Sequence, residues 1–220
     1  MEYAIEVKNL KRAYSDFTLN NVSFALPEGC IMGFIGENGA GKSTTIKLIL
    51  DLIRRDSGEI KLLGKTDPHG DKAFREHLGV VIDEACFPEN LSGKNINAVM
   101  KRIYKTWDEA KYRKMLKDFS LPYDKAIKDY SRGMKMKLSI AAALSHDSRL
   151  LLLDEATSGL DPIVRDEILD VFLNFIQDER HSIFMSSHIL SDLEKICDYI
   201  AFIHKGSLVF CESKETLSDE

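Results

Sequence analysis

The segment that most constrains the fold is residues 36–43, Gly-Glu-Asn-Gly-Ala-Gly-Lys-Ser, which matches the pattern G-x-x-x-x-G-K-[S/T]. The almost continuously apolar residues 30–35 before it predict a buried strand, and the amphipathic stretch 43–53 after it predicts a helix. Such a loop turns backbone N–H groups toward phosphates, and it needs glycine because side chains would obstruct that approach. We therefore expect Lys42 to reach the β- and γ-phosphates of a nucleotide and the Ser43 hydroxyl to coordinate Mg²⁺.

Strand and helix patterns alternate along the chain. Strands are predicted at 4–7, 22–26, 59–63, 78–82, 150–153, 182–185, 199–203 and 208–211, and helices at 163–178 and 189–197. Residues 84–146 have few glycines and apolar residues at helical spacing. We expect one α/β domain over residues 1–220. Its core, residues 1–83 and 147–220, would hold a mostly parallel sheet and an N-terminal antiparallel β subdomain, and residues 84–146 would form an inserted α-helical subdomain.

Composition excludes several classes of protein. The hydrophobic share of 44% is enough for a real core, and the net charge of -5 lacks the basic excess of a dedicated nucleic-acid binder. The four cysteines are scattered, which argues against a zinc site and a disulfide framework. No apolar run reaches the ~18 to 20 residues of a membrane span, and the first ten residues do not resemble a signal peptide. Any work at a membrane would therefore come through a partner.

An acidic pair follows the predicted strand 150–153. Asp154 and Glu155 would lie at the exposed end of this buried strand. Taken alone, such a pair is more often a solvated turn. With a phosphate loop 112 residues upstream, the functional interpretation is favoured: Asp154 would act on Mg²⁺, and Glu155 would orient or activate water.

Three further motifs occur in a defined order. Residues 131–134, Ser-Arg-Gly-Met, open an amphipathic helix whose N-terminus offers a second phosphate-binding surface, although by itself this is only an N-cap. Residues 158–161, Ser-Gly-Leu-Asp, follow the acidic pair. His188 follows the predicted strand 182–185, 34 residues after Asp154, and a lone strand-end histidine is usually structural.

Taken together, these residues resemble the nucleotide-binding subunit of an ATP-binding cassette (ABC) transporter over nearly the whole chain. The resemblance implies a P-loop NTPase core, with residues 36–43 as the Walker A motif and Asp154 as the Walker B acid. It also implies that Glu155 is the catalytic glutamate, His188 the switch histidine and Tyr14 the aromatic residue that stacks on adenine. Two subunits would enclose two ATP molecules, each using its signature sequence, residues 130–134, to cap the γ-phosphate held by the other.

The predicted site divides into three sets. The catalytic residues are Lys42, Glu155 and His188. The ATP-binding residues are Tyr14, Gly36, Glu37, Asn38, Gly39, Ala40, Gly41, Lys42, Ser43, Thr44, Ser131, Gly133, Met134 and Asp161. The Mg²⁺ contacts are Ser43, Asp83 and Asp154. The expected partners are a second copy of the chain and a separate polytopic permease, which would place the protein in the cytoplasm at the inner face of the cell membrane.

Two departures from the family pattern point to a subgroup. Asp83, followed by Glu84, stands where the family usually has glutamine, and a carboxylate there can still bind Mg²⁺ but donates no hydrogen bond. Lantibiotic-export ATPases carry Glu at this position. Arg132 and Met134 replace the usual Gly and Gln of the signature. This pattern resembles exporters of bacitracin, lantibiotics and phenol-soluble modulins, so we expect export of an antimicrobial or amphipathic peptide.

Other interpretations are ATPases that are not coupled to transport, or a protein that binds nucleic acid. Chromosome-maintenance ATPases separate the two nucleotide motifs by long coiled coils, which the 95 residues between Gly36 and Ser131 exclude. Translation-factor relatives carry two cassettes, and here there is one set of motifs. A soluble scaffold ATPase that is not coupled to transport remains the alternative. A nucleic-acid binder is disfavoured: residues 101–117 hold seven basic and two acidic residues, but aromatic residues at helical spacing usually form a core with lysines on the solvated face.

Overall fold

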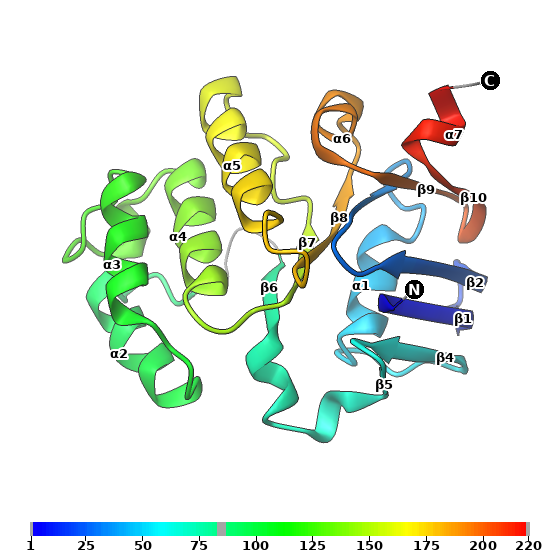
Figure 1. Ribbon diagram of the computed structural model, residues 1–220, viewed down its shortest axis with the longest axis horizontal. Helices are drawn as coiled ribbons and strands as arrows, with labels where there is room; N and C mark the ends of the chain where they lie inside the picture. Colours follow the sequence, from blue (N-terminus) through cyan, green and yellow to red (C-terminus); the bar gives the residue numbers. More distant parts are fainter. Residues whose placement is uncertain (1, 83–86, 219–220) are drawn as a thin grey trace.

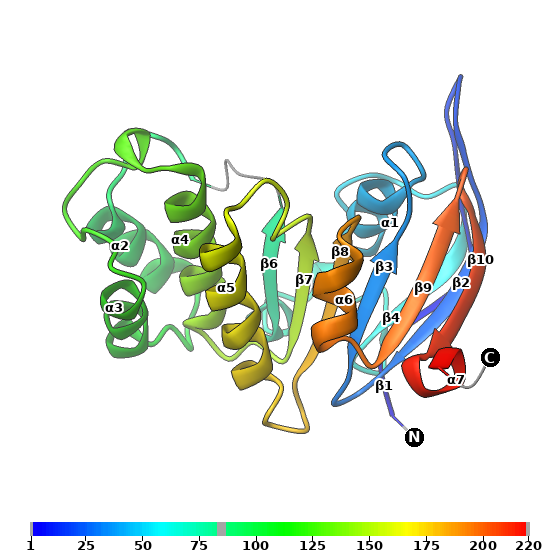
Figure 2. The same cartoon turned by 90° about the horizontal axis from the view of Figure 1, so that it is seen from above.

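A six-stranded sheet forms the centre of the molecule, with the strand order β10-β9-β3-β8-β7-β6 (Figure 2). Its strands are β3 (Ile31–Ile35), β6 (Leu78–Ile82), β7 (Leu150–Asp154), β8 (Ser182–Ser187), β9 (Tyr199–His204) and β10 (Ser207–Ser213). All neighbours pair in parallel except β10, which pairs antiparallel with β9. The computed structural model describes residues 2–82 and 87–218, so Asp83, a predicted Mg²⁺ contact, lies outside the described residues.

A smaller antiparallel sheet, in the order β2-β1-β4-β5, packs beside the central one. It consists of β1 (Tyr3–Ala13), β2 (Thr18–Pro27), β4 (Ser57–Leu62) and β5 (Lys65–Thr66). Helix α1 (Lys42–Ile49) joins this layer, and its Ile46 and Ile49 are fully buried in one hydrophobic cluster with residues of both sheets (Figure 1). The N-terminal antiparallel β subdomain predicted from the sequence is confirmed.

The leucine run of β7 is buried on both faces of the central sheet. Leu150 and Leu152 join the cluster shared with α1 and the smaller sheet, whereas Leu151 and Leu153 join the cluster formed with the helices on the other face. That face is covered by α4 (Arg132–Leu144), α5 (Pro162–Phe175) and α6 (Leu190–Ile196) (Figure 2). A central parallel strand is buried on both of its faces, so its sequence is apolar throughout and does not alternate.

A helical lobe is inserted between β6 and β7, as the sequence predicts (Figure 1). It contains α2 (Gly93–Ile103), α3 (Glu109–Asp118), the 3-10 turn Ile127–Asp129 and α4. Ser92 starts α2 with a capping box, since its hydroxyl accepts from the Asn95 backbone N–H and the Asn95 side chain accepts from Ser92 N–H. Two 3-10 turns, Pro68–Gly70 and Phe74–His77, precede β6, and α7 (Lys214–Ser218) is the last described helix. Among the described residues, no helix is both long and apolar enough to cross a bilayer.

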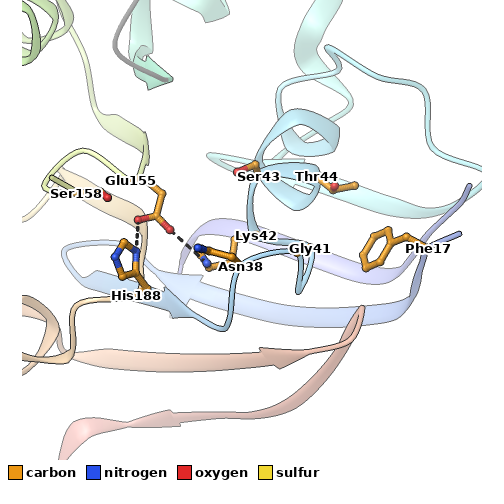
Figure 3. Close-up of a pocket in the computed structure, with 10 residues that line it drawn as sticks. Phe17, Asn38, Gly41, Lys42, Ser43, Thr44, Glu155, Ser158 and His188 are labelled. Carbon is orange, nitrogen blue, oxygen red and sulfur yellow. Dashed lines mark hydrogen bonds and ion pairs between the residues drawn. The ribbon is translucent and has the colours of Figure 1, made fainter. Parts of the chain in front are cut away.

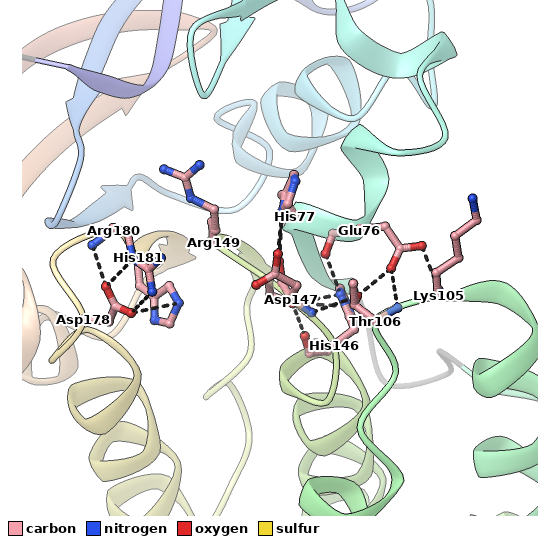
Figure 4. Close-up of polar contacts among 12 residues, drawn as sticks. Glu76, His77, Lys105, Thr106, His146, Asp147, Arg149, Asp178, Arg180 and His181 are labelled. Carbon is pink, nitrogen blue, oxygen red and sulfur yellow. Dashed lines mark hydrogen bonds and ion pairs between the residues drawn. The ribbon is translucent and has the colours of Figure 1, made fainter.

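The lobe meets the core at a polar cluster formed by Glu76, Thr106, His146 and Asp147 (Figure 4). Tyr104 packs on His146 and completes this cluster, which we call the lobe junction. The Glu76 carboxylate accepts hydrogen bonds from the backbone N–H groups of Lys105 and Thr106, both at 3.0 Å, and from the Thr106 hydroxyl at 2.6 Å. The Thr106 hydroxyl in turn accepts from Asp147 N–H at 3.1 Å. One carboxylate thus ties the turn before β6 to the loop between α2 and α3.

His146 contributes a stacked ring to the lobe junction. Its ring stacks on Tyr104 with centroids 3.9 Å apart, and its Nδ1 lies 2.8 Å from the Glu76 carbonyl oxygen. Burial lowers the pKa of His146 below its ordinary value, although the Glu76 carbonyl and the Glu76 and Asp147 charges oppose this effect. The neutral imidazole therefore fills the contact between the lobe and the core.

Candidate active site

The glycine loop runs from the end of β3 into α1, the position that the sequence predicts. A Cβ added to Gly36 would lie 2.4 Å from the carbonyl oxygen of Ile203, so no side chain fits there. Gly41 is the N-cap of α1 with φ +113°, a left-handed conformation that strains other residues, and the helix start receives no side-chain cap. Its first backbone N–H groups remain available for an anion.

Lys42 places its ammonium at the centre of this loop. The residue is 5% exposed, and Nζ donates to the carbonyl oxygens of Gly36 at 2.7 Å and Glu37 at 3.3 Å. The same Nζ lies 3.2 Å from Oε1 of Glu155 in an ion pair (Figure 3). A buried ammonium needs such partners, and here they aim it at the carboxylate that follows β7.

Glu155 stands in a strained backbone conformation at the end of β7. Its φ of +52° lies in the left-handed region, which non-glycine residues seldom adopt. Its N–H lies 3.0 Å from the Ser186 hydroxyl oxygen and 3.2 Å from the Ser186 carbonyl oxygen, which holds the turn in place. Its Oε2 lies 2.7 Å from Nδ1 of His188 (Figure 3). The structure therefore brings Lys42, Glu155 and His188 together.

Ser186 is a residue of the site that sequence reasoning missed. Its hydroxyl donates to Oδ1 of Asp154 at 2.6 Å while it also accepts from Glu155 N–H. Both contacts follow from strand register, because β7 and β8 pair Asp154 with Ser186. Asp154 itself is 7% exposed, so its carboxylate depends on this hydroxyl.

A cavity of about 430 Å³ opens over these groups (Figure 3). It is lined by Phe17, Asn38, Gly39, Gly41, Lys42, Ser43, Thr44, Glu155, Ser158 and His188. Its donor set fits a phosphate chain, since it combines a glycine loop, an ammonium and hydroxyls at a helix start. The Ser43 hydroxyl and the nearby acids are the oxygen ligands that Mg²⁺ prefers, so the residues present also fit that cation.

The aromatic residue at the cavity wall is Phe17, whereas sequence reasoning selected Tyr14. Tyr14 is 41% exposed, its N–H donates to the Phe17 carbonyl oxygen at 2.7 Å, and the Arg12 guanidinium lies 5.1 Å from its ring centroid. The Tyr14 and Phe17 rings are 6.4 Å apart. The turn between β1 and β2 thus places Phe17 at the cavity wall, whereas Tyr14 is not among the residues that line the cavity.

The predicted signature residues start α4. The Ser131 hydroxyl accepts from Met134 N–H at 3.2 Å as an N-cap, and a Cβ on Gly133 would lie 3.2 Å from the Val164 side chain. Asp161 caps α5 in the same way, accepting from Val164 N–H at 3.1 Å. Ser131, Gly133, Met134 and Asp161 thus lie at two neighbouring helix starts, and the residues lining the cavity do not include them.

Comparison with known proteins identifies the family. Residues 19–158 match the ABC transporter family. The chain is 36% identical over 95% of its length to the bacitracin transport ATP-binding protein of Enterococcus faecalis, of which it covers 69%. It is also 36% identical over 93% of its length to the lantibiotic transport ATP-binding protein of Streptococcus pyogenes, of which it covers 89%.

Solved structures agree with this result. An ATP-binding subunit of an ABC transporter superposes with a TM-score of 0.84 at 27% identity, over 98% of this chain and 92% of that one. A nucleotide-free ATP-binding cassette, at 20% identity and a TM-score of 0.82 over 100% and 94%, shares the fold. The predicted fold class is confirmed, and the chain belongs to the ABC transporter family, as an ATP-binding domain of the kind that hydrolyses ATP to drive transport.

Proposed function

We propose that this protein is the ATP-hydrolysing subunit of an exporter whose membrane-spanning part is a separate chain and whose cargo is an antimicrobial or amphipathic peptide. The support is its 36% identity to proteins named for bacitracin and lantibiotic transport. Its place would be the cytoplasm, at the inner face of the cell membrane, and residues 1–220 would act as one nucleotide-binding domain with a helical subdomain at 84–146.

ATP binding would use the loop residues Gly36 to Thr44, with Tyr14 or Phe17 beside the adenine. Lys42 would exchange its ion pair with Glu155 for the β- and γ-phosphates, because one ammonium cannot fully serve both. Ser43 and Asp154 would hold Mg²⁺, with Asp83 as a third contact. When bound, Mg²⁺ neutralises charge on the transferred phosphoryl group.

The proposal for how ATP is hydrolysed rests on the close contacts among Lys42, Glu155 and His188. Once Lys42 turns to the phosphates, the Glu155 carboxylate is free to accept a proton from the attacking water, while the 2.7 Å contact with His188 fixes its orientation. His188 is then placed to help hold the γ-phosphate and that water. The strained backbone of Glu155 fixes the position from which the carboxylate acts.

A complete site would need two copies of the chain. Ser131, Gly133 and Met134 start α4, outside the set of residues that line the cavity of their own chain. In a head-to-tail homodimer they would cap the γ-phosphate held by the partner, since the N-terminus of a helix attracts anions. Asp161 would lie at the same interface.

Glu155→Gln tests the mechanism. We expect this variant to lose about 100-fold or more of its turnover, because it removes a general base, and to accumulate as an ATP-bound dimer. Size-exclusion chromatography with MgATP and a phosphate-release assay measure the two effects. Lys42→Ala is the matched control and should bind ATP weakly and stay monomeric. A Glu155→Gln variant that hydrolyses ATP as fast as the parent would refute the assignment of the base.

A further inference from the structure

Two helices begin close to the active site, one after residues 158–161 and the other after His188. Helix α5 begins directly after residues 158–161, whose Ser158 lines the cavity and donates its N–H to the Glu155 carbonyl oxygen at 3.0 Å. Helix α6 begins two residues after His188. The two helices lie side by side on the same face of the central sheet (Figure 2). A contact between the first turns of α5 and α6 can therefore couple movement of the loop 158–161 to movement of His188.

Arg165 and Asp192 make that contact. Arg165 lies in the first turn of α5 and Asp192 in the first turn of α6. Nη1 of Arg165 is 3.9 Å from Oδ1 of Asp192, beyond hydrogen-bond distance. Nη2 of Arg165 donates to the carbonyl oxygen of Leu160 at 3.2 Å. The guanidinium thus holds the loop before α5 while it faces the carboxylate on α6.

The pair is incompletely bonded, with Asp192 buried and the Arg165 side chain 25% exposed. Asp192 is 2% exposed, and its Oδ2 is buried without a hydrogen-bond partner among the described residues. Nε of Arg165 is likewise buried and has no partner within residues 2–82 and 87–218. A buried carboxylate is costly unless it bonds fully, so the unpartnered Asp192 oxygen favours a movement that brings the Arg165 guanidinium closer.

We propose that Arg165 and Asp192 are positioning residues for ATP hydrolysis, and that their loose ion pair closes to hydrogen-bond distance when the nucleotide site closes. The proposal rests on the proposed ATPase mechanism. Closure of the pair draws the start of α6, and with it His188, toward the loop 158–161. His188 already lies 2.7 Å from Glu155 while the pair is open, so closure would move His188 together with the loop toward the γ-phosphate.

This role predicts a defect in turnover rather than in ATP binding. Gly41, Ser43 and Thr44 lie across the cavity from Ser158 and His188, so ATP affinity should not depend on the pair (Figure 3). A misplaced His188 or Glu155 carboxylate slows the chemical step, because small errors in the position of reacting groups are costly. A purely structural ion pair would instead lower stability and leave the turnover of the folded protein unchanged.

The test compares Asp192→Asn with Asp166→Asn in the full chain. Asp166 and Lys195 join the same two helices by an exposed ion pair of 2.9 Å, which makes Asp166→Asn a matched control. We prefer it to a Lys195 variant because the Asp192 charge also acts on Lys195. For Asp192→Asn we expect kcat to fall about tenfold or more with KM for ATP within about twofold. Asp166→Asn should keep both constants within about twofold of the parent.

Further variants separate positioning from folding. Arg165→Gln should show the same loss in kcat, Arg165→Lys should recover part of it, and the double variant should lose little more than either single one, because the residues act as a unit. Thermal unfolding of each variant corrects kcat for the folded fraction. If Asp192→Asn does not fold, Arg165→Gln carries the same expectation.

The outcomes are distinguishable. Unchanged kcat in Asp192→Asn or Arg165→Gln, or losses that multiply in the double variant, would refute the positioning pair while Glu155→Gln remains inactive. If the parent hydrolyses no ATP, or Glu155→Gln is as active as the parent, the proposed function fails and the positioning pair fails with it.

Discussion

At the scale of single residues, one hydroxyl supports both acids of the site. Ser186 donates to the Asp154 carboxylate at 2.6 Å and accepts from the N–H of Glu155, whose φ is +52°. A left-handed conformation costs a non-glycine residue roughly 1–3 kcal/mol, so surrounding contacts must hold it. The position of the predicted base therefore depends on a neutral residue of the neighbouring strand.

Ser186→Ala should weaken both folding and turnover. Removing the hydroxyl leaves the buried Asp154 carboxylate and the Glu155 N–H without this partner, which costs about 1–3 kcal/mol of unfolding free energy. We expect kcat to fall as well, because Glu155 loses its support. Urea unfolding and steady-state ATP hydrolysis measure the two effects. Ser182→Ala is the control, because Ser182 lies in the same strand as Ser186 but its hydroxyl accepts from the N–H of Gly29, outside the site. If Ser182→Ala lowered kcat as much as Ser186→Ala, the expectation would be contradicted.

Local motifs made part of the site predictable from sequence. Lys42 and Glu155 belong to short patterns whose chemistry is set by neighbouring residues, and the structure brings them within 3.2 Å. Ser186 could not be found in this way, because its role depends on the register that pairs it with Asp154. Phe17 was missed for a similar reason: the turn between β1 and β2 decides which aromatic residue faces the cavity.

At the scale of elements, the central strands were the most predictable. Strand β6 has the predicted bounds, and β7 extends the predicted strand by one residue, because apolar runs without alternation fit strands buried on both faces. Helix α1 ends at Ile49 rather than near residue 53, since Asp51 adopts φ +55° and stops the helix. Strands β1 and β2 are longer than predicted because their pairing continues through register shifts that break the simple alternation.

The lobe junction gives the helical lobe a pH-dependent attachment. Burial lowers the pKa of His146 below 6.5, with Glu76 and Asp147 opposing and Lys111 assisting. The unfolded chain then binds this proton more readily than the folded one. Stability is therefore lost as the pH falls through 6.5, and this loss levels off below the folded pKa.

His146→Gln should flatten this pH dependence. We expect the unfolding free energy of the parent to decrease between pH 7.5 and pH 5.5, and that of the variant to change less, since Gln takes up no proton in this range. At pH 7.5 the variant should be less stable, because it loses the stack on Tyr104. Urea unfolding at both pH values gives the comparison, with His204→Gln at the far side of the sheet as the control. Equal pH slopes for the parent and His146→Gln would contradict the assignment.

At the scale of the whole molecule, the parts of the proposed site are divided between core and lobe. The core carries Lys42, Glu155 and His188 around one cavity, while Ser131 and Gly133 belong to α4 at the edge of the lobe. The lobe junction ties these two parts together. In the proposed head-to-tail dimer, each chain would then present a cavity and a capping helix to its partner, so movement of the lobe would control closure.

The proposed role as the ATP-hydrolysing subunit of an exporter predicts a membrane partner. Tagged protein recovered from gently solubilised membranes of its native cell, in the presence of ATP and vanadate, should carry a stoichiometric polytopic membrane chain that mass spectrometry identifies. Lys42→Ala, which should bind ATP weakly, should lose any increase in recovery that ATP and vanadate bring. If only soluble partners appear and the tagged protein is absent from membranes, the scaffold ATPase is the better description. In that outcome Asp83, which stands where the family usually has glutamine, would mark lost coupling rather than peptide export.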